Sequence, residues 1–208
     1  MSDQRPWHPY VFDTEQRRFV GDFEGMYRAE QEEGFDAWHQ SDPRRLDNQV
    51  AALLLKRITF RTVLDLGCGK GAFTAGLKRR DNQVIGVDVS ETAIQAAREK
   101  YPDIQWTCAA VLDYLAGAEP VDLIVARELL SYVEDWREVL RRCAALSRYV
   151  LVGLFIPPDP IGFVSSYEEL EGELEHHFEV IECVDLRKRR LGTWLCESRT
   201  RPDSEGSG

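Results

Sequence analysis

From about residue 43 onward, short runs of apolar residues alternate with longer amphipathic stretches. The short runs are rich in valine, isoleucine and leucine, which is typical of strands buried on both faces of a parallel sheet. The longer stretches place apolar residues at helical spacing, as at Leu46, Val50, Leu53 and Leu54. Strands and helices that alternate in this way predict an α/β fold built on a mostly parallel sheet.

The pattern predicts seven strands, five of them separated by helices and the last two forming a terminal pair. They cover residues 63–66, 83–88, 104–109, 121–126, 148–154, 178–184 and 192–197. Capping residues predict where three helices begin, at Asp42-Pro43, at Ser90, and at Ser166 with Glu169. A basic run at 187–190 lies between the last two strands and predicts a solvated hairpin turn.

The chain divides into three regions. Residues 1–42 are rich in aromatic residues set among acids, and we expect a lid or cap there, with a helix over about residues 14–33. Most of these aromatic residues are expected to pack on the core, and some of them to close over a substrate. Residues 43–198 hold the alternating strands and helices of the main domain. Residues 199–208 are mostly polar and small, and we expect a disordered tail.

The stretch after the first predicted strand carries the most informative motif. Gly67, Gly69 and Gly71 occupy alternate positions, and a helical pattern begins directly after them. Such a turn lets a ligand approach the backbone and the free N–H groups of the helix start. Two interpretations compete. Gly67, Gly69 and Ala72 fit the dinucleotide fingerprint G-x-G-x-x-G/A, whereas Asp65 and the three glycines give D-x-G-x-G-x-G.

The second pattern resembles the first motif of the class I S-adenosylmethionine-dependent methyltransferases. An acid two places before the first glycine disfavours a pyrophosphate but is compatible with a cofactor that carries an ammonium and a sulfonium. Asp88 ends the next strand about twenty residues beyond the glycines, where a carboxylate suits ribose hydroxyls. The resemblance covers residues 43–198. It implies a Rossmann-like, seven-stranded, mostly parallel sheet with helices on both faces and an antiparallel final strand.

The resemblance also implies which residues hold the cofactor, S-adenosylmethionine, or its product S-adenosylhomocysteine. The glycine loop is expected to contact the amino-acid moiety, and Asp88, Val89 and Arg127 the ribose, the adenine and the methyl-donor region. Family members often carry a polar side chain beside the adenine where this chain has Ala110, so the backbone is the candidate there. The implied cofactor-binding residues are Asp65, Gly67, Cys68, Gly69, Gly71, Asp88, Val89, Ala109, Ala110 and Arg127.

Methyl transfer is an in-line displacement to which orientation and desolvation contribute on the order of 7–11 kcal/mol. A positioned base adds about 10²–10⁴-fold, and a hydroxyl acceptor benefits from it more than an amine does. The candidate catalytic residues are His39, Glu128 and Tyr132. No metal site is expected, because the adjacent His176 and His177 point in different directions on a helix and no third ligand is near in sequence.

Composition narrows the class of partner. The net charge of −10 and the pI near 5.0 disfavour nucleic acid, which binds to basic surfaces that release counterions. No apolar run is long enough to span a membrane. Five cysteines without a CxxC pair indicate a reduced, cytoplasmic setting. We therefore predict a small-molecule substrate.

Narrower predictions rest on the resemblance alone. The helix at Asp42-Pro43 and the apolar run after the fourth strand loosely resemble bacterial enzymes that methylate sugars, glycans or secondary metabolites, on oxygen or nitrogen. An NAD(P)-dependent oxidoreductase stays open as the alternative, although the catalytic Tyr/Lys pair of such enzymes is not visible. A non-catalytic protein that binds S-adenosylmethionine is the third hypothesis. The sequence leaves open whether the protein is a monomer or a homodimer.

Overall fold

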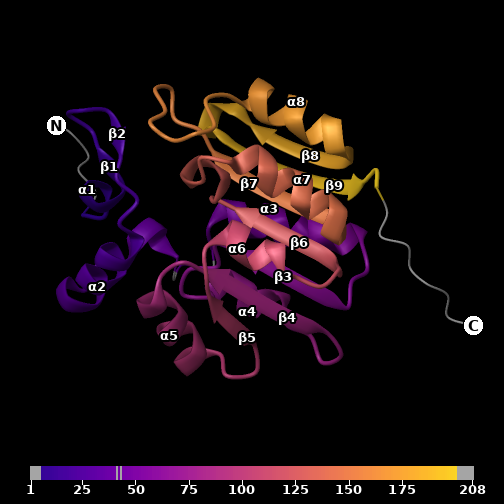
Figure 1. Ribbon diagram of the computed structural model, residues 1–208, viewed down its shortest axis with the longest axis horizontal. Helices are drawn as coiled ribbons and strands as arrows, with labels where there is room; N and C mark the ends of the chain where they lie inside the picture. Colours follow the sequence, from indigo (N-terminus) through magenta and orange to yellow (C-terminus); the bar gives the residue numbers. More distant parts are fainter. Residues whose placement is uncertain (1–5, 41, 43, 201–208) are drawn as a thin grey trace, which may run out of the picture.

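The computed structural model describes residues 6–40, 42 and 44–200. Its centre is a seven-stranded sheet with the strand order β5-β4-β3-β6-β7-β9-β8 (Figure 1). Strands β3 to β7 run parallel, and β9 is antiparallel to both β7 and β8. The predicted seven strands and the antiparallel final strand are therefore confirmed. The strands are β3 (Thr62–Leu66), β4 (Gln83–Asp88), β5 (Gln105–Cys108), β6 (Val121–Arg127), β7 (Ser147–Phe155), β8 (Phe178–Leu186) and β9 (Leu191–Ser198).

Helices cover both faces of this sheet and give three layers. Each set of helices clusters with the strand side chains on its own face, as Ile94 does with Leu123, and Leu140 with Ile124. The helical spacing in the sequence thus marks the stripe that each helix buries. One face is covered by α3 (Leu46–Leu54), α4 (Ala72–Leu77) and α5 (Glu91–Lys100), and the other by α6 (Val111–Ala116), α7 (Trp136–Leu146) and α8 (Tyr167–His177).

Two of the predicted helix caps are confirmed. Ser90 Oγ accepts the backbone N–H of Ala93 at 3.2 Å, and Ser166 Oγ accepts that of Glu169 at 3.1 Å. The basic run also forms the predicted connection between the last two strands. It lies in one of four short 3₁₀ helices, which are η1 (Ala37–His39), η2 (Leu55–Arg57), η3 (Leu130–Tyr132) and η4 (Arg187–Arg189).

The predicted helix start at Asp42-Pro43 is wrong, because α3 begins at Leu46. The carboxylate of Asp42 accepts the backbone N–H of Arg44 at 2.9 Å, and Arg45 has a non-helical backbone with φ −52° and ψ 132°. The acid therefore closes a local turn ahead of the helix instead of capping it. Pro43 itself lies outside the described residues.

Residues 6–40, called the N-terminal segment below, contain more than the one predicted helix. The predicted helix over 14–33 is right only in its second half. Asp13 Oδ1 accepts the N–H groups of Glu15 and Gln16, which closes a turn, and Gly21 with φ +73° bends the chain ahead of the helix. The segment consists of α1 (His8–Val11), β1 (Phe12–Asp13), β2 (Arg18–Phe19), α2 (Phe23–Glu33) and η1.

The N-terminal segment stands beyond one end of the sheet, at the left of Figure 1. It has a small core of its own, in which Trp7, Met26 and Tyr27 pack with Ala93 of α5. Most of its aromatic residues serve this packing, and its action as a lid stays a prediction. The expected disordered tail falls largely on residues 201–208, which lie outside the described residues.

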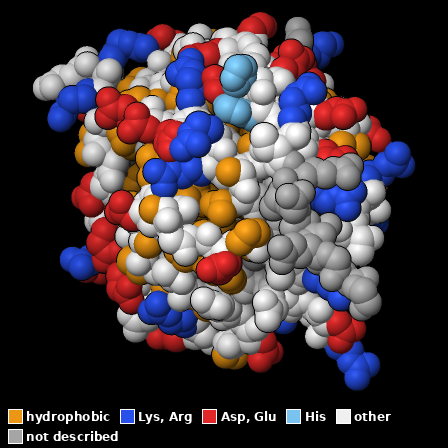
Figure 2. Space-filling model, turned by 45° about the vertical axis from the view of Figure 1, so that its right-hand side comes forward, with side chains coloured by type: hydrophobic (Ala, Val, Ile, Leu, Met, Phe, Trp, Pro, Cys, Tyr) orange, Lys and Arg blue, Asp and Glu red, His pale blue; other side chains and the backbone are white. Residues whose placement is uncertain are grey.

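The surface is charged but mixed in sign. Acidic and basic side chains are interspersed over the face in Figure 2. Among the described residues, no helix combines the length and the apolar character that crossing a membrane requires.

Candidate active site

A cavity of about 450 Å³ lies at the carboxyl ends of the parallel strands, beneath the N-terminal segment. Its volume is within the range of small-molecule sites. Ligands of open α/β sheets bind at this edge, where the strand order reverses, and here β4 and β6 lie on opposite sides of β3. The cavity is lined both by strand ends and by side chains of the N-terminal segment.

The glycine loop that follows β3 presents its backbone at close quarters. Gly67, Gly69 and Gly71 all have positive φ, at +70°, +52° and +76°. A Cβ on Gly69 would lie 2.5 Å from Gln40 Oε1 and 2.7 Å from the Tyr27 hydroxyl. The loop therefore requires glycine both for its conformation and for the approach of neighbouring groups. Gly67 lines the cavity, whereas Gly69 and Gly71 are not among its lining residues.

Asp88, at the end of β4, is fastened to the glycine loop. One carboxylate oxygen accepts the N–H of Gly69 at 2.8 Å, and the other accepts the N–H of Ser90 at 3.0 Å. Burial raises the pKa of this carboxyl, and the backbone N–H groups of Ser90, Gly69 and Val89 oppose the shift. Asp88 lines the cavity, and a carboxylate offers about four acceptor positions. A ligand with hydroxyl donors fits this position.

Asp65 lies within β3 with only 3% of its surface exposed. Its Oδ2 accepts the hydroxyl of Thr74 at 2.5 Å, which ties the strand to α4. Burial raises the pKa of Asp65 to about 6, against the opposing effects of Thr74 and the Arg127 charge. Asp65 also lines the cavity. It therefore both bonds Thr74 of α4 and belongs to the candidate active site.

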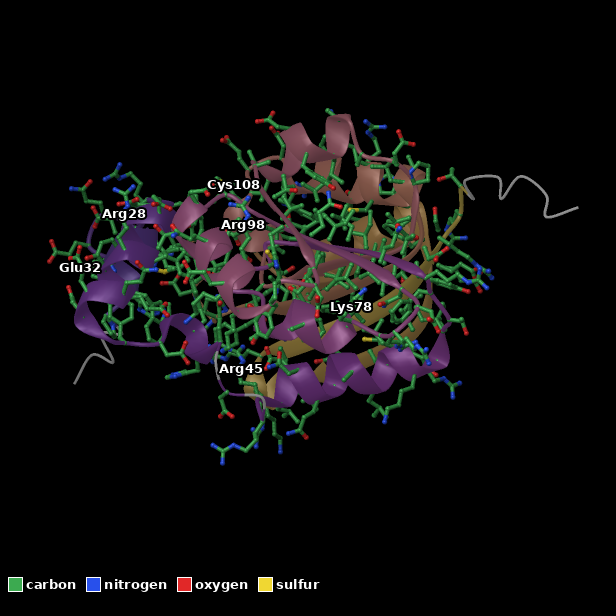
Figure 3. The ribbon with its side chains drawn as sticks, turned by 90° about the horizontal axis from the view of Figure 1, so that it is seen from below. Arg28, Glu32, Arg45, Lys78, Arg98 and Cys108 are labelled. Carbon is green, nitrogen blue, oxygen red and sulfur yellow. The ribbon has the colours of Figure 1, made fainter. Side chains whose placement is uncertain are left out.

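A buried ion cluster closes the side of the cavity next to α3. Asp47 Oδ2 lies 2.6 Å from a guanidinium nitrogen of Arg45 and 2.7 Å from one of Arg127. The Arg127 guanidinium also stacks over the Phe73 ring, 4.0 Å from its centroid. Arg45 donates to the carbonyl of Trp38 as well, and Figure 3 shows it where the N-terminal segment meets α3. The charge of Glu128 also acts on both guanidiniums, so cations and acids are mixed at this wall.

Part of the cavity lining is made of small and apolar residues. They include the predicted adenine-side residues Val89, Ala109 and Ala110, together with Val111 and Leu112. The implied cofactor residues that lie in one cavity wall are thus Asp65, Gly67, Cys68, Asp88, Val89, Ala109, Ala110 and Arg127. Elements far apart in the sequence bring them together, as the strand-end argument expected.

The three candidate catalytic residues separate in the structure. Glu128 and Tyr132 line the cavity. His39 is exposed, and its ring stands edge-on to Trp7 at 5.4 Å, outside the cavity lining. Its neighbours Trp38 and Gln40 line the cavity instead, because Trp38 and His39 both have positive φ and the chain turns sharply there. The placement of His39 does not support a catalytic role.

Sequence reasoning missed the side chains that hold the N-terminal segment over the loops. Lys70 forms ion pairs with Glu30 and, at 2.9 Å, with Asp36. Glu24 accepts the hydroxyls of Ser90 and Thr92, each at 2.7 Å. Burial acts to raise the pKa of Glu24, but these hydrogen bonds outweigh it and lower the pKa to about 2. No local pattern predicts such pairs.

Comparison with known proteins supports the motif reading. Residues 63–148 match the profile of a family described as "Methyltransferase domain". This match covers less than half of the chain. The chain is 33% identical over 113 residues to a protein from Alkalilimnicola ehrlichii named ubiquinone biosynthesis O-methyltransferase, covering 52% of this chain and 45% of the relative. A protein of the same name from Neisseria meningitidis is 32% identical over 142 residues, covering 64% and 53%. The chain thus spans about half the length of these curated relatives.

Solved structures of methyltransferases share the fold of this chain. The N-methyltransferase NodS from Bradyrhizobium japonicum, in complex with S-adenosyl-L-homocysteine, superposes with a TM-score of 0.70 at 22% identity. The match covers 84% of this chain and 98% of that one. A magnesium protoporphyrin IX methyltransferase from Synechocystis with bound SAM gives 0.61 at 17% identity, covering 77% and 79%. At these identities the likeness shows the fold.

Proposed function

We propose that the protein binds S-adenosylmethionine in this cavity and transfers its methyl group to a small molecule. The observation that carries the proposal is the joint between Asp88 and the glycine loop, made by the 2.8 Å bond from Gly69 N–H. This bond fixes the Asp88 carboxylate beside the backbone of the glycine loop. In this proposal the nucleoside and the charged amino-acid moiety of the cofactor lie together there. The match of residues 63–148 to the methyltransferase family supports the same reading.

The chemistry of the lining residues fits the parts of this cofactor. Lone pairs of Asp88 suit the ribose hydroxyls, and the apolar wall around Ala109 and Ala110 suits the adenine. Arg127 and Arg45 suit the carboxylate of the amino-acid moiety, because a guanidinium carries several N–H donors and can bond a second acceptor besides Asp47. When bound, the cofactor supplies an activated methyl group on a sulfonium. The protein's part is to hold it and to exclude water.

The acceptor is a small molecule in this proposal, since the cavity of about 450 Å³ is of small-molecule size and is lined in part by the N-terminal segment. The names of the relatives point to oxygen and that of NodS to nitrogen. The predicted sugar, glycan or secondary metabolite stays a prediction, as do the cytoplasmic location, the absence of nucleic acid among the partners and the oligomeric state.

Titration calorimetry with S-adenosylmethionine, S-adenosylhomocysteine and NAD tests the proposal. We expect micromolar binding of the first two and none of NAD. The Asp88→Ala variant should lose on the order of 10–100-fold in affinity, because hydrogen bonds to a charged group contribute about 1.5–3 kcal/mol. Asp103→Ala, at an exposed acid, is the control.

Binding of NAD, without binding of S-adenosylmethionine or S-adenosylhomocysteine, would favour the oxidoreductase alternative. Binding of S-adenosylmethionine without product, in a screen over hydroxyl and amine acceptors, would instead favour the non-catalytic protein. The two failures are therefore distinguishable.

A further inference from the structure

The residue directly after β6 has an unusual backbone. Glu128 has φ +51°, a left-handed conformation that side chains with a Cβ rarely adopt. Its N–H donates to the carbonyl of Gly153 at 2.7 Å, which holds it in register with β7. Strained residues of this kind persist where the surroundings fix them and gather at functional sites. Glu128 is one of the residues that line the cavity.

The Glu128 carboxyl is left without a cationic partner although cations lie near it. Asp47 accepts from both Arg45 and Arg127, so within the described part of the chain these guanidiniums are paired with Asp47. Glu128 Oε2 accepts only a backbone N–H, that of Phe155, at 3.2 Å. The other oxygen is available to a group in the cavity, which is what a proton acceptor requires.

Aromatic rings form the part of the cavity between Glu128 and the N-terminal segment. Phe19, Phe23, Trp38 and Tyr132 all line it, and Tyr132 lies 5.5 Å from Phe23 and 6.1 Å from Trp38 between ring centroids. This surface excludes water and offers flat, apolar faces to a guest. An acceptor that fits it is itself flat and apolar, and carries the reacting group toward Glu128.

We propose that Glu128 is the general base of the transfer and that the acceptor is a hydroxyl carried by a flat, apolar group. This inference rests on the proposed function and narrows it to methylation of oxygen. An amine acceptor has a free lone pair in its neutral form, whereas a hydroxyl must lose its proton as the new bond forms. A carboxyl without a cationic partner, next to aromatic side chains, can accept the proton that a hydroxyl acceptor must lose.

The step balances as follows. The acceptor oxygen gives its proton to Glu128 and forms a bond to the methyl carbon. The carbon–sulfur bond breaks, and its electron pair remains on sulfur, which becomes a neutral thioether. The proton leaves Glu128 for solvent when the products depart.

The surroundings of Glu128 suit this task near neutral pH. Burial raises its pKa to about 7; the Phe155 N–H and the charges of Arg127 and Arg45 oppose the shift, and Asp47 adds to it. Tyr132 and Tyr167 also face it, and burial raises their own pKa values, so they stay neutral. A base whose pKa lies near the working pH is the most effective one.

Replacement of Glu128 by Gln tests the proposal with two related probes, catechol and 4-nitrocatechol. We expect unchanged affinity for S-adenosylmethionine and a fall of about 10²–10⁴-fold in the methylation rate of catechol. The rate with 4-nitrocatechol, which ionises far more readily without help, should fall much less. Asp135→Asn, at an exposed acid on the same loop, should leave both rates unchanged.

A second measurement does not depend on turnover. Because the folded pKa of Glu128 is raised above its usual value, the native state binds more protons, and its stability falls as pH rises from about 4.5 to about 7. Glu128→Gln should therefore unfold at a higher temperature than the wild type at pH 8, and the two should converge near pH 4.

Three results would overturn the proposal. They are equal loss of rate for both catechols in Glu128→Gln, methylation of amine probes but of no hydroxyl probe, and a stability difference that does not depend on pH. Failure to bind S-adenosylmethionine would instead overturn the proposed function itself.

Discussion

The two halves of the cavity are built in different ways. The cofactor half is made of residues that directly follow β3, β4, β5 and β6, and much of it is backbone. The acceptor half is made of aromatic side chains that come from the N-terminal segment and from η3. The first half is fixed by the sheet itself. The second depends on whether the N-terminal segment is docked.

This difference assigns different tasks to the two halves. The Asp88 bond to Gly69 lies inside the domain core, whereas Glu24 reaches Ser90 across 66 residues and Lys70 reaches Glu30 across 40. Through Lys70, the loop after β3 also binds the N-terminal segment. Docking of the segment shapes the acceptor chamber next to the same glycine loop, so we expect the binding of one ligand to favour that of the other.

The largest expected effect tests the backbone of the cofactor half. In Gly71→Ala the new Cβ would lie 2.3 Å from Trp106 Cη2, at a position with φ +76°. Trp106 cannot yield easily, because its Nε1 donates to the Tyr101 carbonyl at 2.9 Å. Left-handed strain of about 1–2 kcal/mol and overpacking of about 1–3 kcal/mol predict a loss of about 2–5 kcal/mol, measured by denaturant unfolding.

Gly76→Ala is the matched control. It lies in α4 a few residues on, with open space around the position of its Cβ. It should gain about 0.5–1 kcal/mol, since alanine loses less entropy in a helix than glycine. Equal behaviour of the two variants would mean that the loop does not need its left-handed turn.

The cofactor half is also the half that the sequence predicts best. Gly67, Asp88 and Ala109 each follow a strand whose apolar run is visible, and parallel strands bring such positions to one edge. The partners of Lys70 were not predictable, because nothing local distinguishes Glu30 from other acids of α2. Long-range pairs of this kind are set by the docking of whole elements.

The second prediction tests the link between the two halves. Lys70→Met leaves the buried Glu30 without its cation. Breaking a buried pair costs about 3–5 kcal/mol, and the exposure of Lys70 and Asp36 (21% and 33%) reduces this to about 1–3 kcal/mol. Hydrogen exchange in α2 should speed up while exchange in the central strands changes little.

Glu32→Gln is the control, at an exposed acid that points away from the body of the protein in Figure 3. It should leave exchange in α2 unchanged. If Lys70→Met also left it unchanged, the segment would be held by aromatic packing alone, and coupling between the two ligands would not be expected to pass through Lys70.

Two expectations about the N-terminal segment depended on backbone features that the sequence pattern does not show. His39 looked like a base within reach, but the left-handed turn at Trp38 and His39 sends the ring to the surface. The helix predicted over 14–33 is interrupted because Asp13 closes a turn with its own neighbours. In both cases a short-range backbone feature decided the local structure, and the hydrophobic pattern does not show such a feature. Such features are frequent in the acceptor half, which is why it was the harder half to predict.

The smallest expected effect concerns the rim of the acceptor half. Arg17 bonds Asp159 in the loop after β7, with Nη2 to Oδ1 at 2.7 Å, and both side chains are at least half exposed. Exposed pairs contribute about 0.2–1 kcal/mol, so Arg17→Ala should raise the KM for catechol less than about fivefold and leave cofactor affinity unchanged. Arg18→Ala, whose nearest acid is 3.8 Å away, is the matched control. If the two variants raised KM equally, the loop after β7 would not hold β1 and β2 in position. Phe19 of β2 would then be held in the acceptor half only by its contacts with neighbouring aromatic rings.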